Sequence, residues 1–142
     1  MPQPSSHVVK GASELRLVLG QLVRRLRAEY SFPVAQASVL SRLDREGPQT
    51  QSALAAAEHV RPQSMAQTLA ELATAGLIER RPDPGDRRRI QIELTDRGRE
   101  RVLEGRGRRE DWLAAAIAAE LSPEEQRALL AAVPLLQRLT RR

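Results

Sequence analysis

Apolar residues recur every three or four positions near both ends of the chain. This spacing places them on one face of a helix, so we predict amphipathic helices in residues 11–33 and 110–142. Within the second region, Ser122-Pro123-Glu124-Glu125 combines a serine cap, a proline at the first helical position and a glutamate that completes a capping box. The predicted apolar stripes consist of Leu15, Leu19, Leu22 and Leu26 near the start, and Leu129, Leu130, Val133, Leu136 and Leu139 near the end.

Shorter apolar stripes between these ends predict three more helices. Residues 34–45 form one, which a Gly-Pro pair ends. Residues 51–58 and 61–75 form two others, joined by a connection too short for anything but a tight turn. Pro62 suits the first position of the second of these helices, and Gly76 suits a left-handed cap at its end.

The pattern then changes from helical spacing to alternation. Residues 90–94, Ile-Gln-Ile-Glu-Leu, alternate between apolar and polar side chains as a half-buried strand does. Residues 77–81 precede a Pro-Asp-Pro-Gly-Asp run that is typical of a turn, so the two runs predict a β-hairpin with an arginine-rich tip. Thr95 and Gly98 begin a further helix that could run through Glu120.

Together these elements predict a mainly α-helical protein with one small β-hairpin wing. Residues 34–109 are expected to form a winged helix-turn-helix region that includes the start of the long fifth helix. Residues 11–33 and 110–142 are expected to be dimerisation helices, because they carry more leucine than the central region could cover. Residues 1–10, of which the first seven are rich in Pro, Gln and Ser, are expected to be a disordered arm.

Composition narrows the class of function. The net charge is +5, all but one of the 23 basic residues are arginine, and Arg80–Arg89 holds five arginines against two aspartates. Such a local basic cluster is typical of nucleic-acid binding. The absence of cysteine excludes disulfides and thiolate metal sites. No stretch is apolar enough for a membrane span or a secretory signal, so we expect a cytoplasmic protein with no membrane contact.

The helix pair and the hairpin together suggest a binding surface for duplex DNA. The second helix of such a pair fits the major groove, which is about 12 Å wide, and its N-terminal end faces the bases. The polar residues at the N-terminal end of this helix could also be an ordinary solvated surface. The hairpin favours DNA binding, because three adjacent arginines at its tip repel one another, whereas the negative potential of a narrow minor groove attracts them. We therefore predict major-groove contacts from Arg61, Gln63, Ser64 and Gln67, and wing contacts from Arg87, Arg88 and Arg89.

The segment from Asp86 to Gly98 resembles the wing signature of the MarR family of transcriptional regulators. It has an Asp, one residue, an Arg, five residues, Leu-Thr, and a Gly three positions after the Thr. The resemblance implies that Arg88 enters the minor groove and that Asp86 organises the wing through a salt bridge with an arginine. Upstream, residues at the family's habitual positions are Leu54, Ala55, Val60, Pro62, Ser64, Leu72, Gly76, Leu77 and Ile78.

The chain departs from the family pattern at two positions in the turn. His59 stands where a small residue, often glycine, is usual, and Arg61 replaces the usual Ser or Thr cap before Pro62. The resemblance also implies a homodimer with both termini in the interface, and a small aromatic or anionic effector that releases DNA. Tyr30 and Phe32 are candidates to line an effector pocket, although a core or interface position explains them at least as well.

We therefore predict a sequence-specific transcriptional regulator, a repressor, that binds a near-palindromic operator in double-stranded DNA as a homodimer. Helix 61–75 would lie in the major groove and wing 82–89 in the minor groove. The alternative is a winged-helix module that binds RNA or a protein partner without operator specificity. No enzyme, cofactor or metal site is expected, because His7 and His59 are the only histidines and the acidic residues mostly alternate with arginines at helical spacing.

Overall fold

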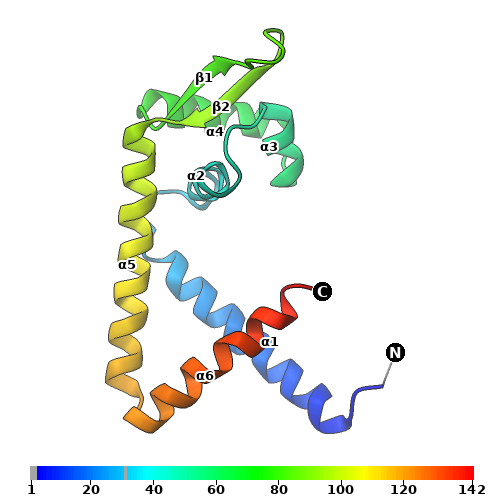
Figure 1. Ribbon diagram of the computed structural model, residues 1–142, viewed down its shortest axis with the longest axis vertical. Helices are drawn as coiled ribbons and strands as arrows, with labels where there is room; N and C mark the ends of the chain where they lie inside the picture. The colour runs from blue at the N-terminus through cyan, green and yellow to red at the C-terminus, as the bar shows by residue number, and fades with distance from the viewer. Residues whose placement is uncertain (1–2, 31) are drawn as a thin grey trace. The chain divides into compact units, whose positions relative to one another are not determined.

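The computed structural model describes residues 3–30 and 32–142, which divide into two compact units, Met1–Gly107 and Arg108–Arg142 (Figure 1). The described residues are mainly helical, with one two-stranded antiparallel sheet, so the predicted fold class is confirmed. In chain order the elements are α1 (Ser6–Arg27), α2 (Val34–Glu46), α3 (Gln51–Ala57), α4 (Pro62–Thr74), β1 (Ile78–Pro82), β2 (Ile90–Leu94), α5 (Asp96–Glu120) and α6 (Pro123–Leu139).

The core of the first unit lies among α2, α3, α4, the hairpin and the first turns of α5. The inward positions expected from the helical spacing are buried there, and three leucines, Leu54, Leu69 and Leu72, are completely shielded from solvent. Phe32 is half-buried and packs against the edge of this core, where the Arg101 guanidinium lies 4.9 Å from the centre of its ring. The other core residues are Val39, Leu40, Leu43, Ala55, Met65, Leu77, Ile78, Ile92, Leu94 and Val102.

The helix ends follow local rules that the sequence already displays. Pro62 occupies the first turn of α4, and Gly76 has φ +75° directly after that helix. At α6 the Ser122 side chain accepts a hydrogen bond from the Glu125 amide, while the Glu125 carboxylate accepts one from the Ser122 amide. This capping box was predicted, and it satisfies two amides that a helix start leaves without partners.

The hairpin pairs Ile78 with Leu94 and Pro82 with Ile90, and its inner face adds Ile78, Ile92 and Leu94 to the core. Gln49, from the loop before α3, extends the sheet by exchanging backbone hydrogen bonds of 3.0 Å and 2.7 Å with Ile92. This additional bridge was not expected, because its two residues are far apart in the sequence.

The Leu-Thr and Gly positions of the wing signature have a structural explanation. The Thr95 hydroxyl donates to the Gly76 carbonyl at 2.6 Å and accepts from the Gly98 amide at 3.0 Å, so it joins the end of α4 to the start of α5. Gly98 lies against the backbone of Leu77, where a side chain would collide. Both residues therefore fix the way the hairpin leads into α5.

The start of the first helix corrects one expectation. Residues 6–10, which we expected in a disordered arm, are the first residues of α1. Ser5 begins the helix because its hydroxyl accepts a hydrogen bond from the Val8 amide at 3.4 Å, and the helical pattern continues upstream of Gly11. Residues 1 and 2 of the expected arm lie outside the described residues.

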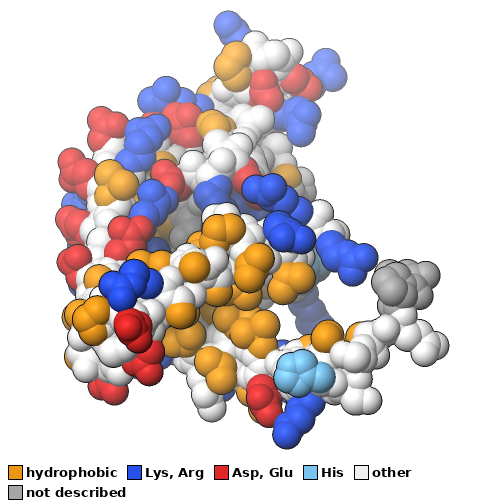
Figure 2. Space-filling model, turned by 60° about the horizontal axis from the view of Figure 1, so that its bottom comes forward, with side chains coloured by type: hydrophobic (Ala, Val, Ile, Leu, Met, Phe, Trp, Pro, Cys, Tyr) orange, Lys and Arg blue, Asp and Glu red, His pale blue; other side chains and the backbone are white. Residues whose placement is uncertain are grey.

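Neither α1 nor α6 contains a buried residue. Figure 2 shows hydrophobic side chains gathered on the face that it turns forward. No helix in residues 3–30 and 32–142 is both long enough and apolar enough to cross a membrane. Most positions of the two predicted apolar stripes are exposed, and Leu26 and Leu136 are half-buried. The exposed positions are Leu15, Leu19 and Leu22 on α1, and Leu129, Leu130, Val133 and Leu139 on α6.

Candidate nucleic-acid interface

The turn between α3 and α4 reverses the chain within four residues. His59 has φ +55°, the one positive value found among non-glycine residues in the described part of the chain. The His59 amide donates to the Ala56 carbonyl at 3.2 Å, and the Val60 amide donates to the Ala55 carbonyl at 3.0 Å. These two bonds form a Schellman motif, which requires a left-handed residue at the position of His59.

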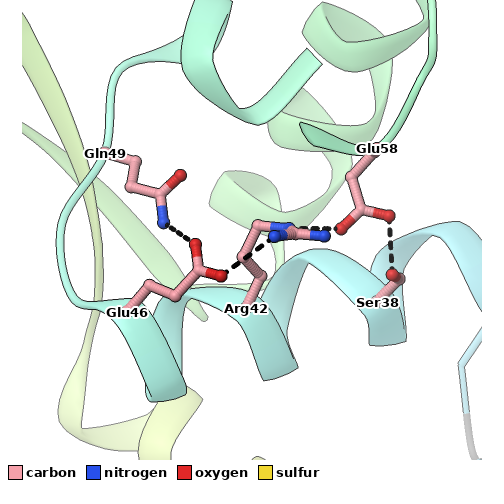
Figure 3. A network of polar contacts seen from close by, with 5 residues as sticks. All are labelled: Ser38, Arg42, Glu46, Gln49 and Glu58. Carbon is pink, nitrogen blue, oxygen red and sulfur yellow. Dashed lines mark hydrogen bonds and ion pairs between the residues drawn. The ribbon is translucent and has the colours of Figure 1, made fainter. Parts of the chain in front are cut away.

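A polar network anchors this turn to α2 (Figure 3). The Glu58 carboxylate accepts hydrogen bonds of 2.7 Å from both the Ser38 hydroxyl and Arg42 Nε. Arg42 also contacts Glu46 at 3.0 Å, and Gln49 donates to Glu46 at 2.6 Å. Burial by itself raises the pKa of Glu58, but the hydrogen bonds from Arg42 and Ser38 and the charge of Arg42 hold it below its ordinary value of 4.5.

The start of α4 presents the predicted polar residues to solvent. They lie on the exposed side of a helix whose opposite side buries Met65, Leu69 and Leu72. Arg61 is the N-cap residue but makes no side-chain capping bond, so its guanidinium is not committed to the helix end. Gln67 lies 3.4 Å from Glu71, one turn further along the helix. All four predicted residues, Arg61, Gln63, Ser64 and Gln67, are exposed.

Two aspartates hold the tip of the wing. Asp83 accepts hydrogen bonds of 2.8 Å from the Gly85 amide and from the Gln91 side chain, and these two bonds lower its pKa, with the Gln91 contribution the larger. Asp86 accepts from the Arg88 amide at 3.0 Å. No arginine among the described residues forms the implied salt bridge with Asp86, whose observed contact with the wing is the bond from the Arg88 amide.

Asp83 is an organising residue that the sequence interpretation missed. The signal was available in Asp83-Pro84-Gly85, since an aspartate two residues before a glycine often accepts the amide of that glycine in a tight turn. The second bond, from Gln91, depends on strand pairing and had no local signal.

Arg81 in β1 and the arginines of the tip differ in their contacts. Arg81 bridges Glu79 at 2.8 Å and Glu93 at 2.7 Å, two carboxylates that face each other across the strands. It therefore neutralises a like-charge pair at the base of the wing. The arginines of the tip are exposed and have no ion pair within 4 Å among the described residues: Arg87, Arg88 and Arg89.

A groove of about 450 Å³ lies between the start of the helix pair and the start of β2, next to the tip of the wing. Pro62 of α4 lines one part of it, and Arg89 and Ile90 of the hairpin line another. Thr50, Gln51 and Ser52 complete it with two hydroxyls and an amide. The groove thus joins the two surfaces that were predicted separately. The sequence predicted Thr50 as the cap of α3 but gave none of these last three residues a role in binding DNA.

The described residues do not place three or more His, Cys, Asp or Glu side chains where they could hold a metal ion. His7 is the second residue of α1, and His59 lies in the turn before α4.

Comparison with known proteins identifies the family. A model of the MarR family matches residues 32–90. An uncharacterised HTH-type transcriptional regulator of Mycobacterium bovis is 39% identical over 128 residues, which cover 88% of this chain and 89% of that protein. The crystal structure of a transcriptional regulator from Pseudomonas aeruginosa is 39% identical, with a TM-score of 0.82 over 96% of this chain and 98% of that one.

A more distant structure shares the fold. It is a variant of MepR from Staphylococcus aureus, solved bound to an oligodeoxyribonucleotide, with 23% identity and a TM-score of 0.67 over 91% of this chain and 95% of its own. The family and these relatives are transcriptional regulators and not enzymes. The chain therefore belongs to the MarR family of transcriptional regulators, as a winged helix-turn-helix DNA-binding protein.

Proposed function

We propose that the protein is a sequence-specific repressor that binds a near-palindromic operator in duplex DNA as a homodimer. In this proposal α4 enters the major groove and the wing, residues 82–89, enters the minor groove. The observation that carries the proposal is the pairing of an exposed polar helix start with an unneutralised arginine tip, with a groove between them. The DNA-bound MepR variant, which shares the fold, provides a precedent for this class of partner.

The exposed face of α4 suits base recognition. Glutamine and serine can donate to or accept from base edges, and arginine can bind guanine with two parallel hydrogen bonds. Because the opposite face of α4 is packed into the core, the four polar residues are held on a rigid element. We assign major-groove contacts to Arg61, Gln63, Ser64 and Gln67.

The wing arginines are proposed to act differently from one another. A duplex that contacts both α4 and the wing must place the backbone between its two grooves over the surface between them. Arg89 lines the groove at that place, so we assign it to a backbone phosphate. Arg87 and Arg88 lie further out on the tip and are assigned to the minor groove, where the negative potential of narrow A·T-rich segments attracts arginine.

A homodimer explains the exposed leucines of α1 and α6. Two copies would cover these stripes, and a two-fold axis would present two α4 helices to successive major grooves, about 34 Å apart. The operator would then contain an inverted repeat with the same spacing.

Selection and sequencing of random duplex DNA, carried out at two salt concentrations, tests the proposal. We expect the wild-type protein to enrich an inverted repeat. The Arg88→Ala variant should bind this repeat more weakly and should lose the preference for A·T-rich flanks. Arg89→Gln should weaken binding to all sequences and reduce the salt slope by about 1. The absence of any enriched motif would contradict the proposal.

The alternative is a winged-helix module for RNA or a protein partner. Sequence-specific RNA binding usually uses aromatic side chains as stacking platforms, and this chain has one Phe, one Tyr and one Trp. Competition of the selected DNA duplex by an RNA duplex of the same sequence separates the two functions. Equal competition by RNA would favour the alternative.

We also propose that a small aromatic or anionic effector releases the operator, as the family resemblance implies. A library of aromatic acids tested by thermal shift and by displacement of the operator would identify it. A library that neither stabilises the protein nor displaces DNA would contradict this part of the proposal.

A further inference from the structure

The chain contains the same helix ending twice, once with glycine and once with histidine. After α4, the Gly76 amide donates to Ala73 and the Leu77 amide donates to Leu72, in the same pattern that His59 and Val60 make after α3. Gly76 has φ +75° and His59 has φ +55°. Glycine adopts this conformation freely, whereas the Cβ of histidine is crowded there, so only the turn before α4 carries backbone strain.

At the glycine ending, the Gly76 carbonyl accepts a hydrogen bond from the Thr95 hydroxyl at 2.6 Å, whereas the strained ending is anchored through a carboxylate of its own turn. Glu58, directly before His59, is held to α2 by the Ser38 hydroxyl and by Arg42 Nε, each at 2.7 Å (Figure 3). The corresponding residue before Gly76 is Ala75, whose side chain can form no hydrogen bond. Strained conformations persist where the surroundings hold them in place, and here the anchor lies next to the strain.

Packing alone leaves room beside this turn. A cavity of about 100 Å³ lies between Ala35 of α2, Val60 of the turn and Thr68 of α4, with Glu58 at its wall. Val60 is itself exposed. Beside this cavity, the bonds from Ser38 and Arg42 to Glu58 connect α2 to the turn.

We propose that Glu58 is a positioning residue for DNA binding: with Ser38 and Arg42 it holds His59 in the left-handed conformation and thereby fixes the start of α4. Without this anchor the turn leaves the left-handed region for part of the time, and Arg61, Gln63 and Ser64 lose their common orientation toward a groove. The proposal rests on the proposed function, since it assigns the anchor a role in operator binding.

The first test measures operator affinity by fluorescence anisotropy for Glu58→Ala and for Glu46→Ala. Each variant removes one carboxylate from Arg42, but only Glu58 belongs to the turn. We expect Glu58→Ala to weaken binding on the order of tenfold and Glu46→Ala to change it by less than about twofold. Equal effects from the two variants would overturn the proposal.

A rescue experiment separates positioning from a general loss of structure. In the Glu58→Ala background, His59→Gly supplies a residue that adopts the left-handed conformation without an anchor. We expect the double variant to bind within about threefold of His59→Gly alone. A double variant that remains as weak as Glu58→Ala would overturn the proposal.

Hydrogen exchange without DNA provides a readout that does not depend on the proposed function. The Val60 amide, bonded to Ala55, should exchange about tenfold faster in Glu58→Ala than in wild type, while the Leu77 amide in the glycine-containing motif should not change. Unchanged exchange at Val60 would overturn the anchor even if wild type binds DNA. Faster exchange in a protein that binds no duplex would refute the proposed function alone.

If circular dichroism shows that the Glu58→Ala variant is unfolded, the Glu58→Gln variant replaces it in all three measurements. Glutamine keeps the length of the side chain and removes its charge, so the expected changes have the same direction and are smaller. Wild-type affinity and wild-type exchange in this variant would count against the proposal.

Discussion

Gly98 lies where α5 passes the backbone of Leu77. A Cβ at this position would collide with the Leu77 carbonyl oxygen, and it would lie 3.0 Å from the Leu77 carbonyl carbon and 3.3 Å from a Leu94 methyl group. Both neighbours belong to the core, so neither can move away without disturbing other contacts. Gly107, later in the same helix, has no atom within 4 Å of the corresponding position.

These two glycines form a matched pair for a stability measurement. We expect Gly98→Ala to lower the free energy of unfolding by about 2 kcal/mol, because overpacking a core contact costs on the order of 1–3 kcal/mol. Gly107→Ala should raise it by about 0.5–1 kcal/mol, because alanine favours an unobstructed helix. Urea unfolding of both variants measures the difference, and equal effects would mean that the contact at Gly98 is absent.

Single residues also explain why some local rules were sufficient. Three helix starts depend only on residues within four positions of one another. They are the bonds of Ser122 with Glu125, the bond of Thr50 with Ala53, and Pro62 in the first turn of α4. Their hydrogen bonds and φ preferences do not depend on the rest of the fold. The same reasoning fails at His59, where the local preference opposes the observed conformation and a contact from α2 accompanies it.

At the scale of elements, the wing is a short hairpin whose tip has its own hydrogen bonds. The Asp83 amide donates to the Arg89 carbonyl at 2.8 Å, and the Arg89 amide donates to the Asp86 carbonyl at 3.0 Å. The side chain of Asp83 adds one bond within the turn, from the Gly85 amide, and one that joins the turn to Gln91 of β2. The tip therefore presents its arginines from a partly rigid loop.

Substitution of Asp83 distinguishes this organising role from simple electrostatics. We expect Asp83→Ala to weaken operator binding about fivefold, in line with the loss of about 1 kcal/mol of hydrogen bonding. Asp83→Asn should weaken binding less, because its amide oxygen can still accept from Gly85. If the charge of Asp83 were its only effect, both variants would bind DNA more tightly, and anisotropy titrations decide between the two outcomes.

In the hairpin, the alternation of apolar and polar residues predicts which face is buried, but it does not predict which residues of the two strands lie opposite each other. The period of residues 90–94 identified the buried face, and Ile92 and Leu94 are buried as expected. Arg81 could be assigned to a Glu79 and Glu93 pair only after the register placed these two carboxylates opposite each other. An arginine that the charge count had included in the basic cluster is thus committed to the base of the wing.

On the scale of the whole molecule, the leucines of α1 and α6 lack cover within one chain. Leu129 is 41% exposed on the apolar stripe of α6, and Leu103 is 59% exposed on α5. Monomeric proteins rarely leave extended apolar stripes in water, so we expect a second copy to cover both stripes, including Leu129 on α6.

Analytical ultracentrifugation of two glutamate variants tests the dimer. We expect wild type and Leu103→Glu to sediment as dimers, and Leu129→Glu to shift toward the monomer at micromolar concentration, because a buried unpaired carboxylate costs several kcal/mol. Operator affinity should fall with the dimer fraction. A wild-type monomer, or a Leu129→Glu variant that remains fully dimeric, would contradict this arrangement.

The sequence by itself determined the helices, their caps, the hairpin and the residues that face the core, because these depend on spacing and on bonds between near neighbours. It also identified the exposed polar start of α4 and the arginines of the wing. Tertiary structure alone decided that Glu58 meets Arg42 across 16 residues, that Asp83 meets Gln91, and that Gln49 pairs with Ile92. These contacts arise only when packing of the core brings distant segments together, so no local pattern could encode them.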